Sequence, residues 1–464
     1  MRSVNASLAQ RVVRGLWVAE MAVLLLSVCG AVWLRFLDDP ESRALFLQAA
    51  PLRALLVALV LTGSMAAFGL YQPHGRLDRY GFGLRLVMAF VFGGVVLLVV
   101  YYLLPQAYIG RGVLALSLLI GLVAVMLGRR LAQALFGAGQ FRRRVLVLGA
   151  GRTANLINTS MRRRSDRQSF VIAGFVPMPG QEQAVEAATC LLPQPSLVEF
   201  AVTSGIHEIV IAPDERRGGL PMEQLLACAQ KGIRVTELPD FFEREAGCLK
   251  LSVLEPSSLV FSGGFDHSLP RRLSKRLFDL SAASLLLLVA WPVMAVVALC
   301  VWAEGGGPVL YRQTRVGEDG RVFELAKFRS MRSDAEADGV ARWASRDDDR
   351  VTRIGRFLRM SRLDELPQLF NVLRGDMSFV GPRPERPHFV SQLDAQLRYY
   401  GVRHSVKPGL TGWAQLRYPY GASVHDAGEK LKFDLFYVKN QGLVLDVLIL
   451  LQTVEVVLFR RGAR

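Results

Sequence analysis

The stretch RVLVLGAGRTANLI, residues 144–157, separates two kinds of sequence in this chain. It begins with an unbroken apolar run typical of a buried strand, passes through a glycine turn and enters a helix-like segment. Gly149, Gly151 and Ala154 match G-x-G-x-x-A, the tight turn that lets a phosphate approach a helix N-terminus. Further strand-like runs follow, at residues 170–177, 208–213 and 232–239. Strands that alternate with helix-like pieces predict a parallel α/β domain over residues 141–250.

The glycine turn raises the question of nucleotide binding. A Rossmann domain places a ribose-binding acid about 20 residues beyond the turn. The acid nearby, Asp166, lies in a basic loop rather than at the end of a second strand. Two interpretations therefore stay open: a Rossmann-like domain that binds a nucleotide, or an α/β domain whose role is structural or regulatory.

Four apolar stretches precede this domain within residues 1–135. They run over residues 16–37, 52–71, 84–104 and 113–127. Each is close to the roughly 20 residues that cross a bilayer, which predicts a four-helix transmembrane domain. The first stretch is too long, and too soon followed by others, for a cleaved signal peptide. Glu20 inside it is either a functional intramembrane group or a residue near the interface that faces a neighbouring helix.

Arginines in the loops predict the orientation of these helices. They gather before the first stretch, between the second and third, and after the fourth: Arg2, Arg11, Arg14, Arg76, Arg79, Arg85, Arg129, Arg130 and Arg142 to Arg144. The other two loops carry fewer: Arg43, Arg53 and Arg111. By the positive-inside rule, the N-terminus and everything after the fourth helix are cytoplasmic.

The composition agrees with a membrane protein and excludes other classes. Of 464 residues, 51% are hydrophobic, and the formal net charge is +16. A basic, apolar chain indicates a positively charged cytoplasmic side or the handling of phosphates. We expect no nucleic acid partner, because the arginines are spread through the chain without a zinc-finger or RRM-like pattern. The five cysteines form no CxxC pair, which excludes a disulfide framework and a zinc site.

A second long apolar stretch follows the α/β domain, after a linker over residues 251–270 that is rich in serine, proline and glycine. It covers residues 280–302 and has basic residues on both sides: Lys275, Arg276, Arg312, Arg315, Lys327 and Arg329. A spanning helix would put one basic flank outside, against the positive-inside rule. Pro292 near the middle would kink a helix. Both features favour a re-entrant helix near residues 276–303, with a plain fifth span as the alternative.

Two segments further along have a clear local pattern. VLYRQTRVGEDGRVFELAKFRSM, residues 309–331, predicts a hairpin with Glu318, Asp319 and Gly320 at its turn. The last apolar segment, residues 443–459, carries scattered polar residues. It therefore predicts a membrane-surface or core helix rather than a span.

Two adjacent carboxylates, Asp364 and Glu365, stand in LDELPQLFNVLRGDMSFVGPRP, residues 363–384. Pro367 suits the first turn of a helix and Gly375 suits its end, so we expect a short helix over residues 365–373. Acids at such a start can converge on one point. On the helix alone, Asp364 would be an N-cap and Glu365 a favourable first-turn charge.

Arginines flank this pair on both sides. Upstream they recur every three residues, at Arg353, Arg356, Arg359 and Arg362. Downstream, Arg383 is held between two prolines. A carboxylate pair can hold Mg²⁺, which binds phosphate oxygens, and arginine grips phosphate in bidentate geometry. A carboxylate can also be a nucleophile that forms an acyl phosphate. The pattern predicts metal-assisted phosphate transfer at a membrane surface.

Residues 272–464 resemble the catalytic domain of the bacterial sugar transferases, the polyprenyl-phosphate glycosylphosphotransferases or monotopic phosphoglycosyl transferases. The resemblance runs through KRLFDLSAASLLLLVAWPVM, GGPVLYRQTRVG, FELAKFRSM, RVTRIGRFLRMSRLDELPQLFNVLRGDMSFVGPRPE and VKPGLTGWAQ. The N-terminal half is similar, less closely, to the long members, which place four transmembrane helices and a Rossmann-like domain first. The implied architecture ends in a mixed α/β catalytic domain, residues 271–464, with a re-entrant helix.

The resemblance implies an activity and its partners. Members transfer a hexose 1-phosphate from a UDP-sugar to undecaprenyl phosphate and release UMP, the first membrane step of exopolysaccharide or O-antigen synthesis. It also implies a multi-pass protein of the bacterial inner membrane, in contact with membrane lipids, whose catalytic domain faces the cytoplasm. The transferred sugar and the oligomeric state, with a homodimer as one candidate, stay open. A membrane-anchored nucleotide-sugar dehydratase is excluded, because no Tyr-x-x-x-Lys pair occurs.

Site residues follow from the matched motifs. Asp364 would be the nucleophile that forms a phosphosugar–aspartate intermediate, and Glu365 would help it hold Mg²⁺. Three residues match phosphate-binding positions of the family: Lys327, Arg359 and Arg383. Pro292 matches the proline that breaks the re-entrant helix, although Trp291 stands where the family often has serine. We expect Asp364→Asn to abolish turnover, and Glu365→Gln mainly to weaken metal dependence.

Overall fold

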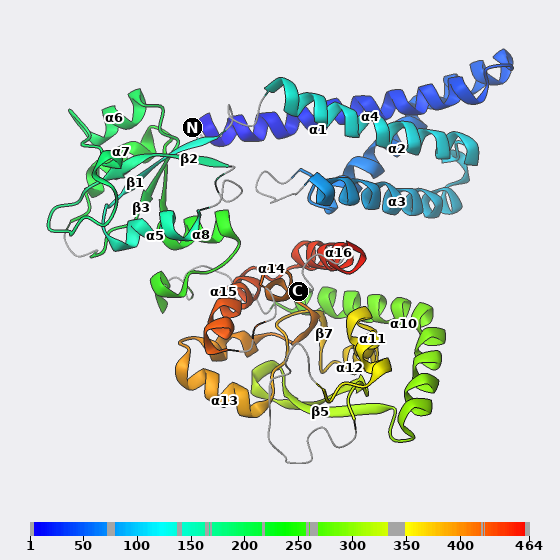
Figure 1. Cartoon of the computed structure of the whole chain (residues 1–464). Coiled ribbons are helices and arrows are strands. Elements are labelled where there is room, and N and C mark those ends of the chain that lie inside the picture. The colour runs from blue at the N-terminus through cyan, green and yellow to red at the C-terminus, as the bar shows by residue number, and fades with distance from the viewer. Residues whose placement is uncertain are drawn as a thin grey trace. The chain divides into compact units, whose positions relative to one another are not determined.

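The computed structural model describes most of the chain: residues 4–71, 79–136, 142–162, 167, 169–215, 219–256, 259, 268–332, 349–418, 421 and 423–459. The chain divides into two compact units, Met1–Ala246 and Gly247–Arg464, each described by itself (Figure 1). Arg2, Arg76, Asp166 and residues 257, 258 and 260–267 of the predicted linker lie outside the described residues.

The four predicted apolar stretches all form helices in the first unit. These are α1 (Val4–Arg35), α2 (Pro40–Ala67), α3 (Arg79–Leu103) and α4 (Arg111–Phe136). Parts of α1, α3 and α4 are long and apolar enough to cross a membrane, whereas the apolar part of α2, Pro51–Ala67, is shorter. The start of α2 is fixed locally, because the Asp39 side chain accepts a hydrogen bond from the Ser42 N–H and Pro40 occupies the first turn.

Glu20 faces a neighbouring helix, which supports the second of its two interpretations. It lies in the middle of α1, and both of its carboxylate oxygens contact the guanidinium of Arg129, towards the end of α4. Arg129 Nη1 also donates to the Leu70 carbonyl at 2.9 Å. Both charged residues are buried. Buried charges of opposite sign compensate each other, so this pair joins α1 to α4 within a mostly apolar bundle.

The parallel α/β prediction is confirmed. Strands β1 (Arg143–Leu148), β2 (Phe170–Val176), β3 (Glu208–Ile211) and β4 (Arg234–Glu237) form one parallel sheet in the order β2-β1-β3-β4. The accompanying helices are α5 (Arg152–Ser160), α6 (Leu197–Thr203), α7 (Met222–Gln230) and α8 (Leu238–Ala246). The order matches the first four strands of the flavodoxin-type arrangement, whose switch point lies between β1 and β3.

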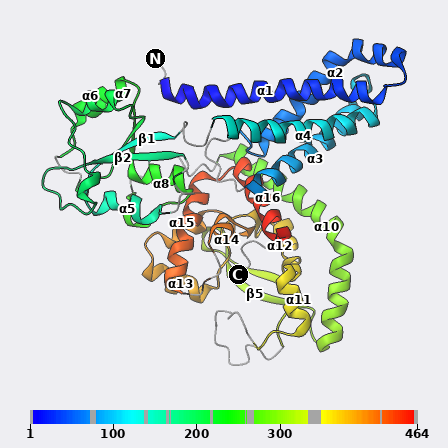
Figure 2. The ribbon, with the colours of Figure 1, turned by 45° about the horizontal axis from the view of Figure 1, so that its top comes forward.

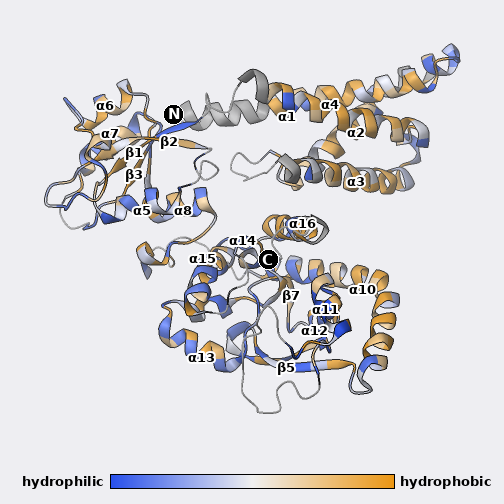
Figure 3. Cartoon of the chain, viewed as in Figure 1, coloured by the Kyte–Doolittle hydropathy of each residue, from blue (hydrophilic) through white to orange (hydrophobic). Residues whose placement is uncertain are grey.

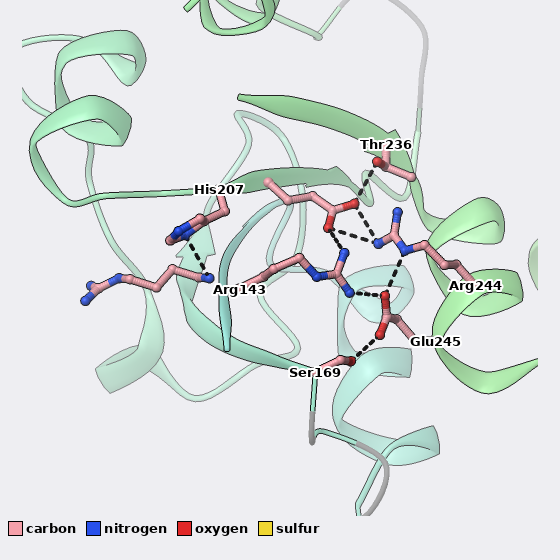
Figure 4. Close-up of polar contacts among 8 residues, drawn as sticks. Arg143, Ser169, His207, Thr236, Arg244 and Glu245 are labelled. Atoms are coloured by element: carbon pink, nitrogen blue, oxygen red, sulfur yellow. Dashed lines mark hydrogen bonds and ion pairs between the residues drawn. The ribbon is translucent and has the colours of Figure 1, made fainter. Parts of the chain in front are cut away.

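A polar network lies where these strands begin (Figure 4). Glu208, at the start of β3, accepts hydrogen bonds from Arg143, Thr236 and Arg244. Glu245 on α8 binds the same two arginines. Ligands of parallel sheets bind at the opposite, carboxyl ends of strands. The network therefore ties α8 to the sheet at the edge opposite the glycine turn.

The first long helix of the second unit is α10 (Leu269–Gly305), which contains Pro292. Figures 1 and 2 both show α10 changing direction part-way along its length, as an internal proline predicts. Figure 3 shows hydrophobic colour over most of α10 beyond its start. Many of its large apolar side chains are exposed: Leu285, Leu288, Val289, Trp291, Val296, Leu299 and Trp302.

The beginning of α10 is bound to the rest of the unit by polar side chains. Lys275 donates to Asp446 and to the Val380 carbonyl, at 2.8 and 3.1 Å. Arg276 donates to two carbonyls at the end of α12 (Gln368–Arg374). Asp279 is buried and accepts from Ser378 and from the Phe379 N–H. These contacts explain why charged residues stand at the start of an apolar helix.

The remaining elements form a mixed α/β body. The predicted hairpin is confirmed: β5 (Leu310–Val316) pairs antiparallel with β6 (Val322–Phe328), and Asp319 at the turn has φ 54°. Strands β7 (Ser378–Val380) and β8 (Gly409–Thr411) are parallel. The helices are α11 (Arg353–Ser361), α12, α13 (Pro387–Gln396), α14 (Trp413–Arg417), α15 (Val424–Asn440) and α16 (Leu443–Phe459).

The two ends of this unit pack onto its core. Asp446 of α16 is fully buried and accepts hydrogen bonds from Lys275 and from the Tyr437 hydroxyl, and Ile449 lies in the core. The described part of the predicted linker is also packed, because Leu254 and Leu259 join a buried cluster with Phe389. The apolar residues of the linker thus belong to the second unit.

Candidate functional site

The carboxylate pair lies before the helix in which we expected it. Asp364 and Glu365 belong to a short 3-10 turn, Leu363–Glu365, which precedes α12 rather than forming its first turn. The cause is Arg362, which ends α11 in the left-handed conformation with φ 60° and turns the chain into the 3-10 segment. The helix that we predicted over residues 365–373 therefore starts at Gln368, after Pro367, and ends at Arg374, with Gly375 as the expected C-cap. Asp364 does not cap α12.

Asp364 is buried, with 7% of its surface exposed. Within the described part of the chain, its Oδ1 atom has no hydrogen-bond partner. Burial and the neighbouring Glu365 raise the pKa of Asp364, against the lowering effect of Lys327, Arg359 and Arg362. A buried acceptor without a donor costs free energy, so this oxygen is a candidate for reacting with a ligand or binding one.

Glu365 has the opposite environment. Its Oε1 atom lies 3.1 Å from Arg383 Nη2, 3.5 Å from Lys327 Nζ and 3.6 Å from Arg362 Nη1. Burial raises the pKa of Glu365, but these three cations outweigh burial and bring the pKa down to about 2. The pKa values of the two adjacent carboxyl groups are thus shifted in opposite directions. Glu365 is held ionised by the surrounding cations, while Asp364 is the more basic of the two.

The phosphate-binding residues that we predicted come together here from separate elements. Lys327 lies on β6, and its burial, despite the nearby acids, lowers its pKa to about 8. Arg359 on α11 acts electrostatically on Asp364, and its Nε atom donates to Ser330 Oγ at 3.0 Å. Arg383 comes from the proline-flanked segment after β7. The structure therefore places all three around the acid pair.

Of the four upstream arginines, only the last two interact with the acid pair in the described part of the chain. Arg359 and Arg362 act on the acid pair, whereas Arg353 and Arg356 do not enter the contacts that the structure describes there. Each three-residue step along a helix turns the side chain by about 60° away from the starting face. Arginines at this spacing therefore spread around α11 instead of forming one basic face.

Asn371 is a site residue that the sequence did not reveal. It is buried on α12, where its Nδ2 donates to the Glu324 carbonyl at 2.7 Å and its Oδ1 accepts from the Ala326 N–H at 3.1 Å. It thereby fixes β6 against α12 directly beside Lys327. An amide within a helix gives no local signal of a partner 45 residues away.

The acid pair fits a magnesium ion in a limited sense. Among the described residues, no group of three or more His, Cys, Asp or Glu side chains is placed to hold a metal. Mg²⁺, however, is often bound by one or two carboxylates together with substrate phosphates. The unpartnered Oδ1 of Asp364, beside the ionised Glu365, meets that requirement.

At the glycine turn of the first unit, a carboxylate of the same chain binds the start of α5. Asp214, after β3, accepts hydrogen bonds from the Arg152 and Thr153 N–H groups at the start of α5, at 3.0 and 2.7 Å. A Cβ on Gly151 would lie 2.0 Å from Asp214 Oδ2, and one on Gly149 would lie 2.3 Å from the Ala212 carbonyl. Gly149 is therefore required by the backbone opposite it, Gly151 leaves room for the Asp214 side chain, and a carboxylate stands where a phosphate would bind.

We expect the glycine turn of the wild-type protein not to bind nucleotides. In the full-length protein, NAD or NADP should leave hydrogen exchange over residues 149–156 unchanged. Asp214→Ala should speed exchange at the first α5 amides about fivefold, since a lost cap costs about 1 kcal/mol. Asp240→Ala, an exposed acid in the first turn of α8, is the control and should have no effect on α5. Protection by a dinucleotide would show that the carboxylate is displaced.

The segment that contains the acid pair matches a known protein family. The model of the family described as bacterial sugar transferase matches residues 270–460. A UDP-glucose:undecaprenyl-phosphate glucose-1-phosphate transferase of Xanthomonas campestris pv. campestris is 32% identical over 437 residues, which cover 90% of this chain and 89% of that protein. The chain belongs to the bacterial sugar transferase family.

Other relatives match over a shorter length. A UDP-N-acetylgalactosamine-undecaprenyl-phosphate N-acetylgalactosaminephosphotransferase of Aeromonas hydrophila is 41% identical over 52% of this chain and 56% of its own. A UDP-glucose:undecaprenyl-phosphate glucose-1-phosphate transferase of Escherichia coli K12 is 37% identical over 56% of each. This chain thus spans about half the length of some relatives and nearly all of another. The region that matches the family model contains the whole acid pair with its cations, and it begins with α10.

Proposed function

We propose that this sugar transferase moves a hexose 1-phosphate from a UDP-sugar to undecaprenyl phosphate and releases UMP. The observation that carries the proposal is the asymmetry of the acid pair. Asp364 presents a buried, unpartnered oxygen, while Glu365 gathers Lys327, Arg362 and Arg383 beside it. A nucleophile next to a cluster of phosphate-binding cations is what transfer of a phosphoryl group requires. The names of the relatives support the two substrates.

The chemistry proceeds in two displacements at one phosphorus. In the first, a carboxylate oxygen of Asp364 forms a bond to the phosphorus that carries the sugar, the bond to the UMP oxygen breaks, and UMP leaves with the electron pair. In the second, a phosphate oxygen of the lipid attacks the same phosphorus and the bond to Asp364 breaks. The carboxylate is regenerated, and no oxidant or reductant is needed. A covalent step lets a water-soluble donor and a membrane-bound acceptor use one site in turn.

The surrounding cations have separate tasks in this scheme. Arg383 and Lys327 are held at Glu365 with their charges directed at the acid pair, where they offset the negative charge that the donor diphosphate brings. Arg359 acts electrostatically on Asp364 and lowers its pKa, which favours the ionised, nucleophilic carboxylate. Asp364 and Glu365 would hold Mg²⁺, which supplies further positive charge for the phosphate oxygens and the leaving group.

We infer that α10 is a re-entrant helix that keeps the site at the membrane surface. Its support is the bend, the internal Pro292, the exposed apolar side chains and the basic residues on both flanks. A lipid phosphate stays at the surface of the bilayer, so the protein must bring its acids there. With both flanks on one side, the positive-inside rule puts the catalytic unit at the cytoplasmic face of the inner membrane.

The proposal is tested by incubating the purified full-length protein in lipid nanodiscs with undecaprenyl phosphate, Mg²⁺ and radiolabelled UDP-sugars. We expect labelled lipid and UMP in equal amounts, with a clear preference for one among UDP-glucose, UDP-galactose and their N-acetylated forms. A protein that only organises other enzymes would give neither product with any donor. That result would overturn the proposal.

A further inference from the structure

We propose that Arg403 is a positioning residue, which aims the phosphate-binding Arg383 by fixing the backbone on which it stands. The inference rests on the proposed function, in which Arg383 binds donor phosphate. It starts from the segment GPRPE, residues 381–385. Two prolines in this segment remove two N–H donors, so its conformation depends on what its carbonyl groups bind.

Four successive carbonyls of this segment are bound by groups from other parts of the unit. The Pro382 carbonyl accepts from the Gly409 N–H at 2.9 Å, and the Glu385 carbonyl accepts from the Val316 N–H at 3.0 Å. Between them, Arg403 Nη2 donates to the Arg383 carbonyl at 2.9 Å, and Arg315 Nη1 donates to the Pro384 carbonyl at 3.1 Å. The backbone of Arg383 is therefore held by a side chain that lies 20 residues away in sequence.

Arg403 is itself held rigidly. It is 5% exposed, and its guanidinium contacts Asp434 through Nε and Nη2, at 3.1 and 2.8 Å. Its Nη1 donates to the Tyr400 hydroxyl at 2.8 Å. A planar fork can bind three acceptors at once in fixed directions, whereas a lysine ammonium at the end of a flexible stem cannot. The carbonyl of Arg383 is one of these three acceptors.

The burial of this ion pair needs a reason beyond stability. An apolar core of the same volume is often as stable as a buried ion pair, because removing two charges from water is costly. Here the ion pair is one step in a series of contacts. Asp434 on α15 binds Arg403, and Arg403 binds the backbone carbonyl of Arg383. The Arg383 side chain in turn lies 3.1 Å from Glu365. Arg403 thus connects a rigid helix to the acid pair.

The test is Arg403→Lys, which keeps a positive charge opposite Asp434 but cannot also bind the Arg383 carbonyl and Tyr400. We expect kcat to fall about tenfold or more with a smaller change in KM, because small displacements of a phosphate-binding group have large effects on rate. A stability defect alone could also lower activity. The decisive measurement is therefore a double-mutant cycle with Arg383→Ala, in which kcat and the thermal midpoint are both followed.

If Arg403 acts through Arg383, Arg403→Lys should change kcat less than twofold once Arg383 is already alanine. Its effect on the thermal midpoint should be the same in both backgrounds. Arg276→Lys is the matched control, since Arg276 also donates to two backbone carbonyls, those of Val372 and Leu373, at 2.7 Å each. The loss of kcat that it causes should multiply with that of Arg383→Ala.

The outcomes separate this inference from the proposed function. If the losses of kcat caused by Arg403→Lys and Arg383→Ala multiply, the positioning role is overturned. The proposed function still stands in that case, because the wild-type protein turns over. An inactive wild-type protein would overturn both. If Arg403→Lys does not fold, Asp434→Asn takes its place in the cycle, because it weakens the hold on Arg403 and leaves the Arg403 contact with the Arg383 carbonyl. The same twofold limit in the Arg383→Ala background then decides.

Discussion

Asp364→Asn should abolish turnover without unfolding the protein. An amide oxygen is a poor nucleophile, so we expect kcat to fall about 10³-fold or more. Stability should be unchanged or slightly higher, because burial and Glu365 raise the pKa of Asp364 and so disfavour its charged form in the folded state. UMP release and the thermal unfolding midpoint, measured on the same preparation, check both halves of this expectation.

Asp394→Asn is the control for this substitution. Asp394 lies exposed on α13, where neutralising the charge should leave kcat unchanged. A loss of turnover in both variants would indicate a general effect of net charge rather than a nucleophile at Asp364. Full activity in purified Asp364→Asn would refute the assignment directly.

The covalent step can be detected on a defined peptide. Without lipid acceptor, a UDP-sugar labelled in the phosphate next to the sugar should leave label on the wild-type protein. Arg362 and Arg374 bound a tryptic peptide, residues 363–374, that contains both acids. Mass spectrometry should find the phosphosugar on this peptide in the wild-type protein and in Glu365→Gln, but not in Asp364→Asn. Label that persists in Asp364→Asn would place the bond elsewhere.

Local sequence patterns predicted the elements whose structure has local causes. The strand that ends before Gly149, the hairpin that turns at Asp319 and the helix that ends at Gly375 all carry their turn residue within a few positions. The acid pair is different. Its 3-10 turn depends on Arg362 in a left-handed conformation, which arginine rarely adopts and which no neighbouring residue predicts. The helix start was therefore placed three residues too early.

Long-range contacts account for what the sequence could not predict about the site. The Asp214 carboxylate at the glycine turn lies about 60 residues from the amides it binds, so the motif alone resembled an open phosphate site. Asn371 and Arg403 act through backbone atoms of other segments. Local pattern also did not distinguish the two acids, since only the folded structure shows three cations on Glu365 and an unpartnered oxygen on Asp364.

Glu365→Gln should reduce both activity and stability, and this is a larger effect than weakened metal binding alone. Glutamine keeps the shape but removes the charge that Lys327, Arg362 and Arg383 share. We expect about 2 kcal/mol of lost stability at neutral pH, below the range for a fully buried pair because Arg362 and Arg383 remain partly exposed. With two phosphate-binding cations no longer held, kcat should fall about 10²-fold.

The pH dependence of this stability loss follows from the pKa of Glu365, which is lowered from 4.5 to about 2. A group with a lowered pKa contributes its full stability above 4.5, and the contribution disappears as the pH falls through about 2. Thermal midpoints of the wild-type protein and Glu365→Gln should therefore differ most above pH 4.5 and converge at lower pH. Glu324→Gln is the control, because its exposed pair with Arg312 should contribute less than about 1 kcal/mol at any pH.

A magnesium titration separates the two roles of Glu365. If this residue served only as a metal ligand, saturating Mg²⁺ would restore kcat in Glu365→Gln and stability without metal would be unchanged. We expect the opposite on both counts: excess Mg²⁺ raises kcat only in part, and the metal-free variant already unfolds at a lower temperature. The reason is geometric, since Arg383, Lys327 and Arg362 approach the Oε1 atom of Glu365 within 3.1 to 3.6 Å. Its charge organises the site before any ion or substrate arrives.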